Sequence, residues 1–82
     1  MGNIIYRHRI NLSLEKSSRQ FFLDDRIQKG LLQTTNLSEK TLTNIENGNT
    51  LPTLVTLKYL ATALEIDLLE LIKEIIEYIP RR

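Results

Sequence analysis

The chain has 82 residues, a net charge of +1, no cysteine and one histidine, so it has the length of one domain without disulfides or a thiolate metal site. The single histidine, His8, cannot supply a set of nitrogen ligands, and we expect no metal and no cofactor. Aliphatic residues dominate, while aromatic residues and glycines are few, and this composition predicts a single compact all-α domain over residues 1–82.

The sequence also lacks the features of a membrane or secreted protein and those of an enzyme. Its longest apolar runs are a few residues long and its N-terminus has no apolar core of a secretion signal, so we expect a cytoplasmic protein with no membrane partner. The acids form no catalytic set, because adjacent acids on a helix, such as Asp24 and Asp25, point in different directions. We therefore expect that the chain is not an enzyme.

The first half of the chain predicts two helices and then a longer segment. Apolar residues recur at roughly helical spacing near the N-terminus and predict a helix over 3–11. Ser13 is a suitable cap for a second helix over 13–22. The following segment, 23–36, has large aliphatic residues about four positions apart, which predicts additional helix with a break near Gly30.

The next helix is predicted over 39–47 and is polar where a buried helix would be apolar. Ser38 is a suitable N-cap, and Gly48 can end the helix in a left-handed conformation. Only Leu42 and Ile45 are apolar, and a helix this short with two apolar side chains cannot hold itself together in water. Neighbouring helices must carry it while its polar side chains face outward. This pattern is typical of a helix that is presented to a partner.

The last third of the chain predicts two more helices. Thr53 caps a helix over 54–64. Asp67 caps a final helix over 67–79, and Glu70, three residues further on, completes a capping-box pattern. The apolar residues of the first of these helices are expected in the core: Leu54, Leu57, Leu60, Ala61 and Leu64.

The final helix has more apolar surface than the core of one domain requires. A monomer avoids an exposed patch of this kind, and two copies packed through it would bury it, so we predict a homodimer. The other interpretation is that the segment 23–36 covers this face within the monomer. The predicted dimer interface consists of Leu69, Ile72, Ile76 and Ile79.

Short motifs follow one another in a fixed order along the chain. They are Leu12–Ser18, Ile45-Glu46-Asn47-Gly48, Pro52-Thr53-Leu54, Leu57 with Leu60-Ala61, and Leu68 with Glu70-Leu71. In this order they resemble the Cro and lambda-repressor type of helix-turn-helix domain, the XRE-like family, over roughly residues 4–22 and 37–72. The resemblance implies a five-helix fold in which the third helix, 39–47, is the recognition helix that enters the major groove of DNA.

The chain departs from this family at three places. The family joins its second and third helices by a short turn, whereas about fourteen extra residues, 23–36, lie between them here, and we interpret them as an insertion. Another register has no insertion and places the second helix at 28–35. Leu14 stands where the family often has a glutamine that contacts the DNA backbone, and Glu65 stands where it usually has a glycine that ends a helix.

The resemblance places the outward side chains of the recognition helix against base edges. Lysine donates to guanine O6 and N7, asparagine pairs with adenine N6 and N7, threonine contacts the thymine methyl group, and glutamate accepts from cytosine N4. Simple solvation is the alternative role of each. The predicted base contacts are Lys40, Thr41, Asn44, Glu39 and Thr43.

Basic residues of the first two helices and small polar residues after the recognition helix can bind phosphate oxygens and fix the register on DNA. Each basic residue is an ordinary surface charge in the alternative interpretation, and the asparagines only complete the turn. An acid beside the DNA backbone is unfavourable unless it is paired, so Glu46 is expected to be structural, with Arg9 as one conceivable partner. The predicted phosphate contacts are Arg9, Lys16, Arg19, Asn47, Asn49 and Thr50.

These features predict a sequence-specific DNA-binding transcriptional regulator from a bacterium, phage or mobile element. It would be a repressor or a Cro-like switch protein that binds a near-palindromic operator in double-stranded DNA as a dimer. The alternative is a protein-interaction module on the same scaffold, such as an antitoxin, an antirepressor or an accessory factor. Its protein partner would bind the segment 23–36 or the last helix. The mild net charge and the missing glutamine at Leu14 favour this alternative.

Overall fold

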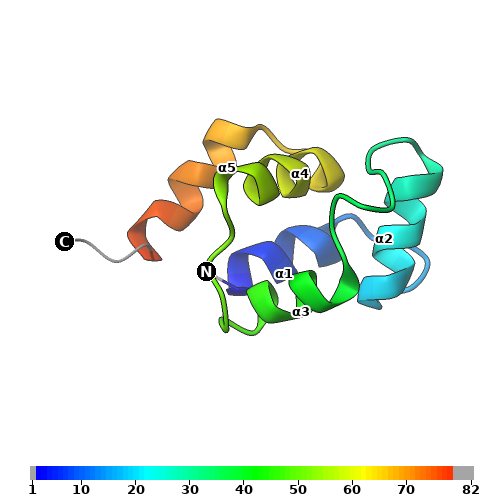
Figure 1. Ribbon diagram of the computed structural model, residues 1–82, viewed down its shortest axis with the longest axis horizontal. Helices are drawn as coiled ribbons and strands as arrows, with labels where there is room; N and C mark the ends of the chain where they lie inside the picture. The colour runs from blue at the N-terminus through cyan, green and yellow to red at the C-terminus, as the bar shows by residue number, and fades with distance from the viewer. Residues whose placement is uncertain (1, 79–82) are drawn as a thin grey trace.

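Five α-helices and one short 3-10 helix make up the described part of the chain, and no strand occurs there (Figure 1). The computed structural model describes residues 2–78; Ile79, which was predicted to lie in a dimer interface, is outside this range. The all-α fold with five helices is therefore confirmed. The elements are α1 (Gly2–Asn11), α2 (Arg19–Gln28), α3 (Glu39–Glu46), α4 (Leu54–Leu64), α5 (Leu68–Ile75) and η1 (Ile76–Tyr78).

Four of the helices begin at a residue whose side chain accepts hydrogen bonds from backbone N–H groups of the first turn. The predicted caps Ser38, Thr53 and Asp67 all do so, which satisfies donors that have no partner within the helix. As a result α3 and α4 begin where the sequence predicts, and α5 begins one residue later. The helix predicted over 67–79 ends at Ile75 and continues as η1.

The predicted helix over 13–22 is wrong, whereas the segment 23–36, predicted to be helical with a break near Gly30, is helical as far as Gln28. Ser13 has a φ of +54°, which ends helical geometry after α1, and α2 begins only at Arg19. Its cap is Ser18, whose hydroxyl oxygen accepts a hydrogen bond from the N–H of Phe21 at 3.1 Å. The chain between α1 and α3 therefore contains one helix and two connections. One joins α1 to α2, and the other joins α2 to α3.

The α2–α3 connection, residues 29–38, folds back on the core instead of extending as a helix. Gly30 has a φ of +78°, and the N–H groups of Leu31 and Leu32 then both donate to the carbonyl of Arg26. This turn buries Leu32 and Leu37. The second helix that the alternative register places at 28–35 is therefore not formed either.

Along α4, the α2–α3 connection borders an open hollow of about 370 Å³. Lys58, Tyr59 and Thr62 line its α4 side. Leu69 and Ile76 of the C-terminal elements remain exposed. The interpretation in which the segment 23–36 covers the apolar face of the last helix is therefore wrong.

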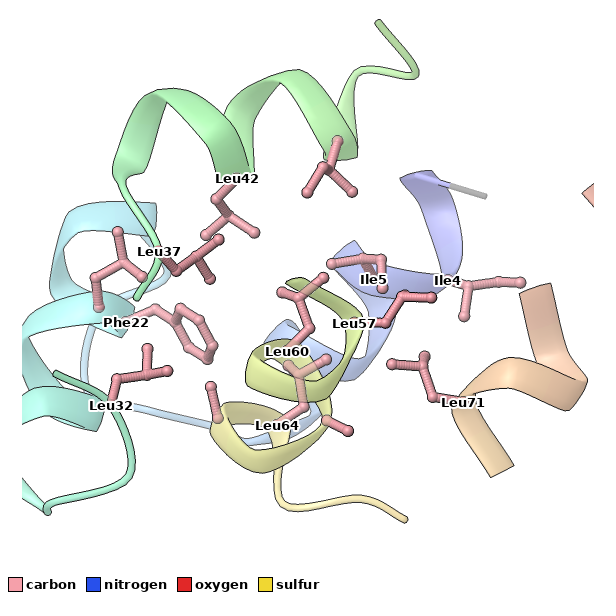
Figure 2. Close-up of a cluster of buried hydrophobic side chains, with 14 of the residues drawn as sticks. Ile4, Ile5, Phe22, Leu32, Leu37, Leu42, Leu57, Leu60, Leu64 and Leu71 are labelled. Atoms are coloured by element: carbon pink, nitrogen blue, oxygen red, sulfur yellow. The ribbon is translucent and has the colours of Figure 1, made fainter. Parts of the chain in front are cut away.

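The hydrophobic core receives side chains from all five α-helices and from the α2–α3 connection, and Figure 2 shows them converging around α4. Of the five α4 residues predicted to be buried, four are, but Leu54 is exposed. The largest fully buried apolar side chains of the core are Ile5, Phe22, Leu42, Ile45, Leu60, Leu71 and Ile75.

A buried arginine joins α2 to the end of α4. The guanidinium of Arg26 donates to the carbonyl of Ala63 at 3.3 Å and to the carboxylate of Glu65 at 2.6 Å, and it is also paired with Asp25. Glu65 ends α4 with a φ of +59°, a conformation that favours glycine. The contact with Arg26 helps to hold the glutamate there.

The cluster of Arg26, Asp25 and Glu65 makes the free energy of unfolding depend on pH in the acid range. The hydrogen bond from Arg26, opposed by partial burial, lowers the pKa of Asp25 below its ordinary value of 3.8. A lowered pKa means that the carboxylate favours the folded state. Its contribution is complete above the pKa of the unfolded chain and is lost as pH falls through the folded pKa. Urea unfolding gives the free energy of unfolding at each pH. Between pH 7 and a pH below 3.8, we expect this free energy to fall less for Asp25→Asn than for the wild type.

The control for this prediction is Glu15→Gln, which removes an exposed acid from the α1–α2 connection. It removes the same formal charge as Asp25→Asn but leaves the partners of Arg26 in place. Identical profiles for the wild type and Asp25→Asn would show that the Asp25–Arg26 pair contributes nothing to acid sensitivity.

Candidate nucleic-acid interface

Helix α3 lies along one edge of the molecule and is held there by two buried side chains. Leu42 and Ile45 are buried in the core, and α3 contacts both α1 and α2 (Figure 1). At about 100° per residue, Lys40, Asn44 and Asn47 lie on the side of α3 opposite these two residues. The helix therefore presents a polar stripe away from the core.

The five predicted base contacts all lie on α3, and none of them is buried. Glu39, Lys40 and Thr41 are exposed, whereas Thr43 and Asn44 are half-buried. The α2–α3 connection does not enclose them. The interface predicted on the recognition helix is thus geometrically accessible.

The first turn of α3 is fixed by two hydrogen bonds between the same two residues. The N–H of Thr41 donates to the hydroxyl oxygen of Ser38 at 3.1 Å, and the Ser38 hydroxyl donates to Thr41 Oγ1 at 2.9 Å. These contacts hold the hydroxyl of Thr41 at the helix end. Side chains that read DNA are most effective on such a rigid element.

The other end of α3 is fixed by a buried ion-pair cluster. Arg9 donates from Nε and Nη2 to the two carboxylate oxygens of Glu46, at 2.7 and 2.9 Å, and Arg19 Nε donates to one of these oxygens at 2.9 Å. The side chains of Glu46 and Arg9 are only 1% and 4% exposed. The conceivable partnership of Glu46 with Arg9 is therefore confirmed.

The prediction that Arg9 contacts phosphate is wrong. Its remaining amino group donates to the carbonyl of Ser17, and its guanidinium lies 5.3 Å from the ring centre of Tyr6. Burial and these contacts leave the guanidinium no surface for a phosphate. Arg9 instead ties α1, the α1–α2 connection and α3 together.

Arg19 remains a candidate phosphate contact. One carboxylate between two guanidinium groups leaves the cluster with one excess positive charge, and only Arg19, at 30% exposure, brings that charge to the surface. Lys16 is also exposed, although it lies on the α1–α2 connection and not on a helix as predicted. Glu46 fixes where the excess charge is presented, beside the C-terminal end of α3.

The α3–α4 connection exposes polar side chains that a phosphate could contact, but few of its backbone N–H groups are available to donate to one. The side chains of Asn47, Asn49 and Thr50 are exposed, as a phosphate contact requires. The N–H groups of Asn47, Gly48 and Asn49, however, donate to carbonyls of α3 at 2.8–3.1 Å. Any contact from Asn47 or Asn49 to phosphate would therefore be made by the side chain.

Sequence reasoning missed the exposed first turn of α2. Gln20 lies beside Arg19 there, and its amide donates to Asp24 at 2.8 Å. The helix predicted over 13–22 places Gln20 in its last turn. The paired serines Ser17 and Ser18 were the available signal for the true start of the helix.

The sequence-predicted dimer interface is in part exposed. Leu69 and Ile76 are exposed and Ile72 is half-buried.

None of the helices described between residues 2 and 78 has the length and apolar character needed to cross a membrane. Within the same residues, no group of three or more potential ligands could hold a metal ion.

No protein-family model matches the chain, and no curated protein or solved structure matches it either.

Proposed function

We propose that this protein is a sequence-specific DNA-binding transcriptional regulator, active in the cytoplasm as a dimer on a near-palindromic operator. The observation that carries the proposal is the placement of α3. Two apolar side chains and a buried ion-pair cluster fix this helix, while its polar stripe stays uncovered at the edge of the molecule. A helix of that kind fits the major groove, where short polar side chains meet base edges.

The charges around α3 support the same proposal. Lys40 is exposed at the start of the helix, and Arg19 brings excess positive charge to the other end. Side chains of Asn47, Asn49 and Thr50 follow on the connection to α4. In this arrangement base contacts come from the stripe, with Lys40 at its start and Asn44 in its middle, and phosphate contacts come from Arg19 and from the polar side chains that follow the helix.

Selection of bound sequences from random DNA, followed by gel retardation over a range of salt concentrations, tests the proposal. We expect enrichment of two inverted half-sites about one helical turn apart, with binding that weakens steeply as salt rises. Absence of any retarded complex at low salt, with purified and folded protein, would refute it.

Asn44 is expected to read one base position. Asn44→Ala should weaken binding to the selected operator by about 1–3 kcal/mol and relax the preference at a single position, because asparagine can bond to adenine N6 and N7 together. Competition binding against operators changed one position at a time measures both effects. Asn11→Ala on the outer side of α1 is the matched control and should bind as the wild type does. A uniform loss across all operators would assign Asn44 to the backbone.

A second candidate function is a protein-interaction module such as an antitoxin, an antirepressor or an accessory factor. The observation in its favour is the set of large apolar residues that stay exposed near the C-terminal end of the fold. This function needs no DNA contact. Absence of a complex at low salt would remove the DNA-binding function and leave this one, whereas an antitoxin would bind both DNA and a protein partner.

A further inference from the structure

The open hollow between the α2–α3 connection and α4 has the size of a small-molecule site. Its volume of about 370 Å³ lies at the lower end of the range of ligand sites in proteins, about 300–1,000 Å³. One wall is the segment 30–36, and the other is the second half of α4 (Figure 1). No residue of α3 lines the hollow. It is therefore separate from the candidate nucleic-acid interface.

Hydrogen bonds within the chain hold the wall formed by the α2–α3 connection. The N–H groups of Leu31 and Leu32 donate to the carbonyl of Arg26 at 2.9 and 3.3 Å. At the other end of the segment, the side-chain oxygen of Asn36 accepts from the N–H of Gln33 at 2.8 Å, and the N–H of Asn36 donates to the carbonyl of Gln33 at 3.0 Å. A ligand would therefore meet a surface that is already formed, which lowers the entropic cost of binding.

The apolar part of the lining comes from three side chains. Leu32 is only 5% exposed, whereas Leu31 and Tyr59 are half-buried. Leu32 belongs to the hydrophobic core, and Tyr59 packs against the core. An aromatic ring is a flat apolar body, and contact with the ring of Tyr59 and with the two leucines would stabilise it in the hollow.

The polar part of the lining donates hydrogen bonds, and one of its donors is a cation. Lys58 is exposed, and no acid within residues 2–78 is paired with it or lines the hollow. The hydroxyl of Thr62 is already used, because it donates to the carbonyl of Lys58 at 3.1 Å. The ammonium of Lys58, the hydroxyl of Tyr59 and the side-chain amide of Asn36 remain as donors.

The acids at the ends of α2 and α4 do not compete for the ammonium of Lys58. The carboxylates of Asp25 and Glu65 are both paired with the guanidinium of Arg26. The hollow thus presents one uncompensated positive charge beside an apolar surface. One ammonium matches a ligand with one negative charge, whereas a phosphate carries nearly two charges and would keep one of them without a partner.

We propose that this hollow binds a small aromatic carboxylate. The carboxylate accepts a charge-assisted hydrogen bond from the ammonium of Lys58, with Tyr59 and Asn36 as the further donors of the lining. The aromatic ring lies against Leu31 and the ring of Tyr59. The ligand thereby bridges the α2–α3 connection and α4. The proposal does not depend on DNA binding, because it uses no side chain of α3.

NMR titration of the isotope-labelled full chain with three probes, benzoate, phenylacetate and indoleacetate, tests the site. We expect at least one probe to bind with a dissociation constant of about 1 mM or below, and to shift the amide resonances of Leu31, Leu32 and Thr62 until they saturate. Phenylacetamide has the shape of phenylacetate without its charge and should bind at least about tenfold more weakly. Absence of saturation with all three carboxylates, or equal binding of phenylacetate and phenylacetamide, would overturn the proposal.

Two substitutions of exposed residues test the role of the charge. Lys58→Gln removes the ammonium and should raise the dissociation constant of the best probe at least about tenfold. Thr62→Glu adds an acid four residues from Lys58 and should weaken binding as well. Lys16→Gln removes an exposed lysine from the α1–α2 connection and is the matched control, with wild-type affinity expected. Wild-type affinity in both Lys58→Gln and Thr62→Glu would overturn the proposal.

Hydrogen exchange tests whether the ligand bridges the two walls. The N–H groups of Leu31 and Leu32, which donate to the carbonyl of Arg26, exchange when the turn at Gly30 opens. A probe at ten times its dissociation constant should slow this exchange about tenfold, because it binds only the closed form. Unchanged exchange of both groups at that concentration would overturn the placement of the ligand between the connection and α4.

Discussion

Glu46→Gln is expected to destabilise the domain by about 3–5 kcal/mol, because it leaves the buried guanidinium of Arg9 without its charged partner. The two carboxylate oxygens of Glu46 accept three hydrogen bonds from Arg9 and Arg19, and a neutral amide can replace only part of this set. The loss is large compared with the stability of a domain of this size. Urea unfolding followed by circular dichroism measures it.

Two variants define the cause of this loss. Glu39→Gln removes an exposed acid from the same helix and is expected to change stability by no more than about 0.5 kcal/mol. The double variant Arg9→Met with Glu46→Leu removes both buried charges and should recover much of what Glu46→Gln loses, since apolar residues often replace a buried ion pair without penalty. If Glu46→Gln unfolds at the same urea concentration as the wild type, the cluster does not hold α3 in place.

Gly2→Ala is expected to have the second largest effect. A Cβ atom at Gly2 would lie 2.0 Å from the carbonyl oxygen of Glu46 and 2.7 Å from its carbonyl carbon. These atoms are backbone at the end of α3 and cannot rotate away, so α1 must move from α3. We expect a loss at the upper end of the range of about 1–3 kcal/mol that overpacking usually costs.

The neighbouring variant Asn3→Ala serves as the control, because Asn3 is exposed in the same first turn of α1. Thermal unfolding should separate the two, with Asn3→Ala close to the wild type. If the proposed function holds, DNA binding by Gly2→Ala should fall as well, since α1 contacts α3. A Gly2→Ala protein of wild-type stability would mean that α1 and α3 do not approach each other so closely.

Local chemistry made much of the fold predictable. The caps Ser38, Thr53 and Asp67 act within three residues of themselves, so their roles follow from the sequence alone. The same holds for the two apolar residues of α3, because two positions three residues apart on a short helix share a side. The outward stripe of α3 follows from the same reasoning.

The start of α2 required information that is not local. Ser13 and Ser18 both have the chemistry of an N-cap, and the choice between them depends on what each register buries. A helix that begins after Ser18 places Phe22, Leu23 and Arg26 toward the interior. Only the whole fold provides the surfaces that these three residues meet. The break near Gly30 was predicted from the sequence, but the turn of the α2–α3 connection back onto the core was not.

Two other kinds of feature could not be predicted from the sequence: contacts between residues far apart in the chain, and the helix faces that no other element covers. Arg9 and Glu46 are 37 residues apart in sequence, and an arginine on a first helix is equally suited to a phosphate or to a buried carboxylate. Similarly, helical spacing places Leu54 beside the buried residues of α4 but does not reveal that no other element of the described chain covers it. That exposure became visible only with the neighbours of α4 in place.

The residues of α3 that hold the helix in the domain differ from those that face outward, and this difference has an evolutionary consequence. The side chains of Leu42, Ile45 and Glu46 are buried, while the remaining residues of the helix are exposed or half-buried. Substitutions at exposed positions such as Lys40 should alter folding by only about 0.5 kcal/mol or less. Substitutions can therefore accumulate on the polar stripe of α3 without unfolding the domain. Under the proposed function, descendants of one ancestral gene could therefore acquire new DNA target sites while keeping the same fold.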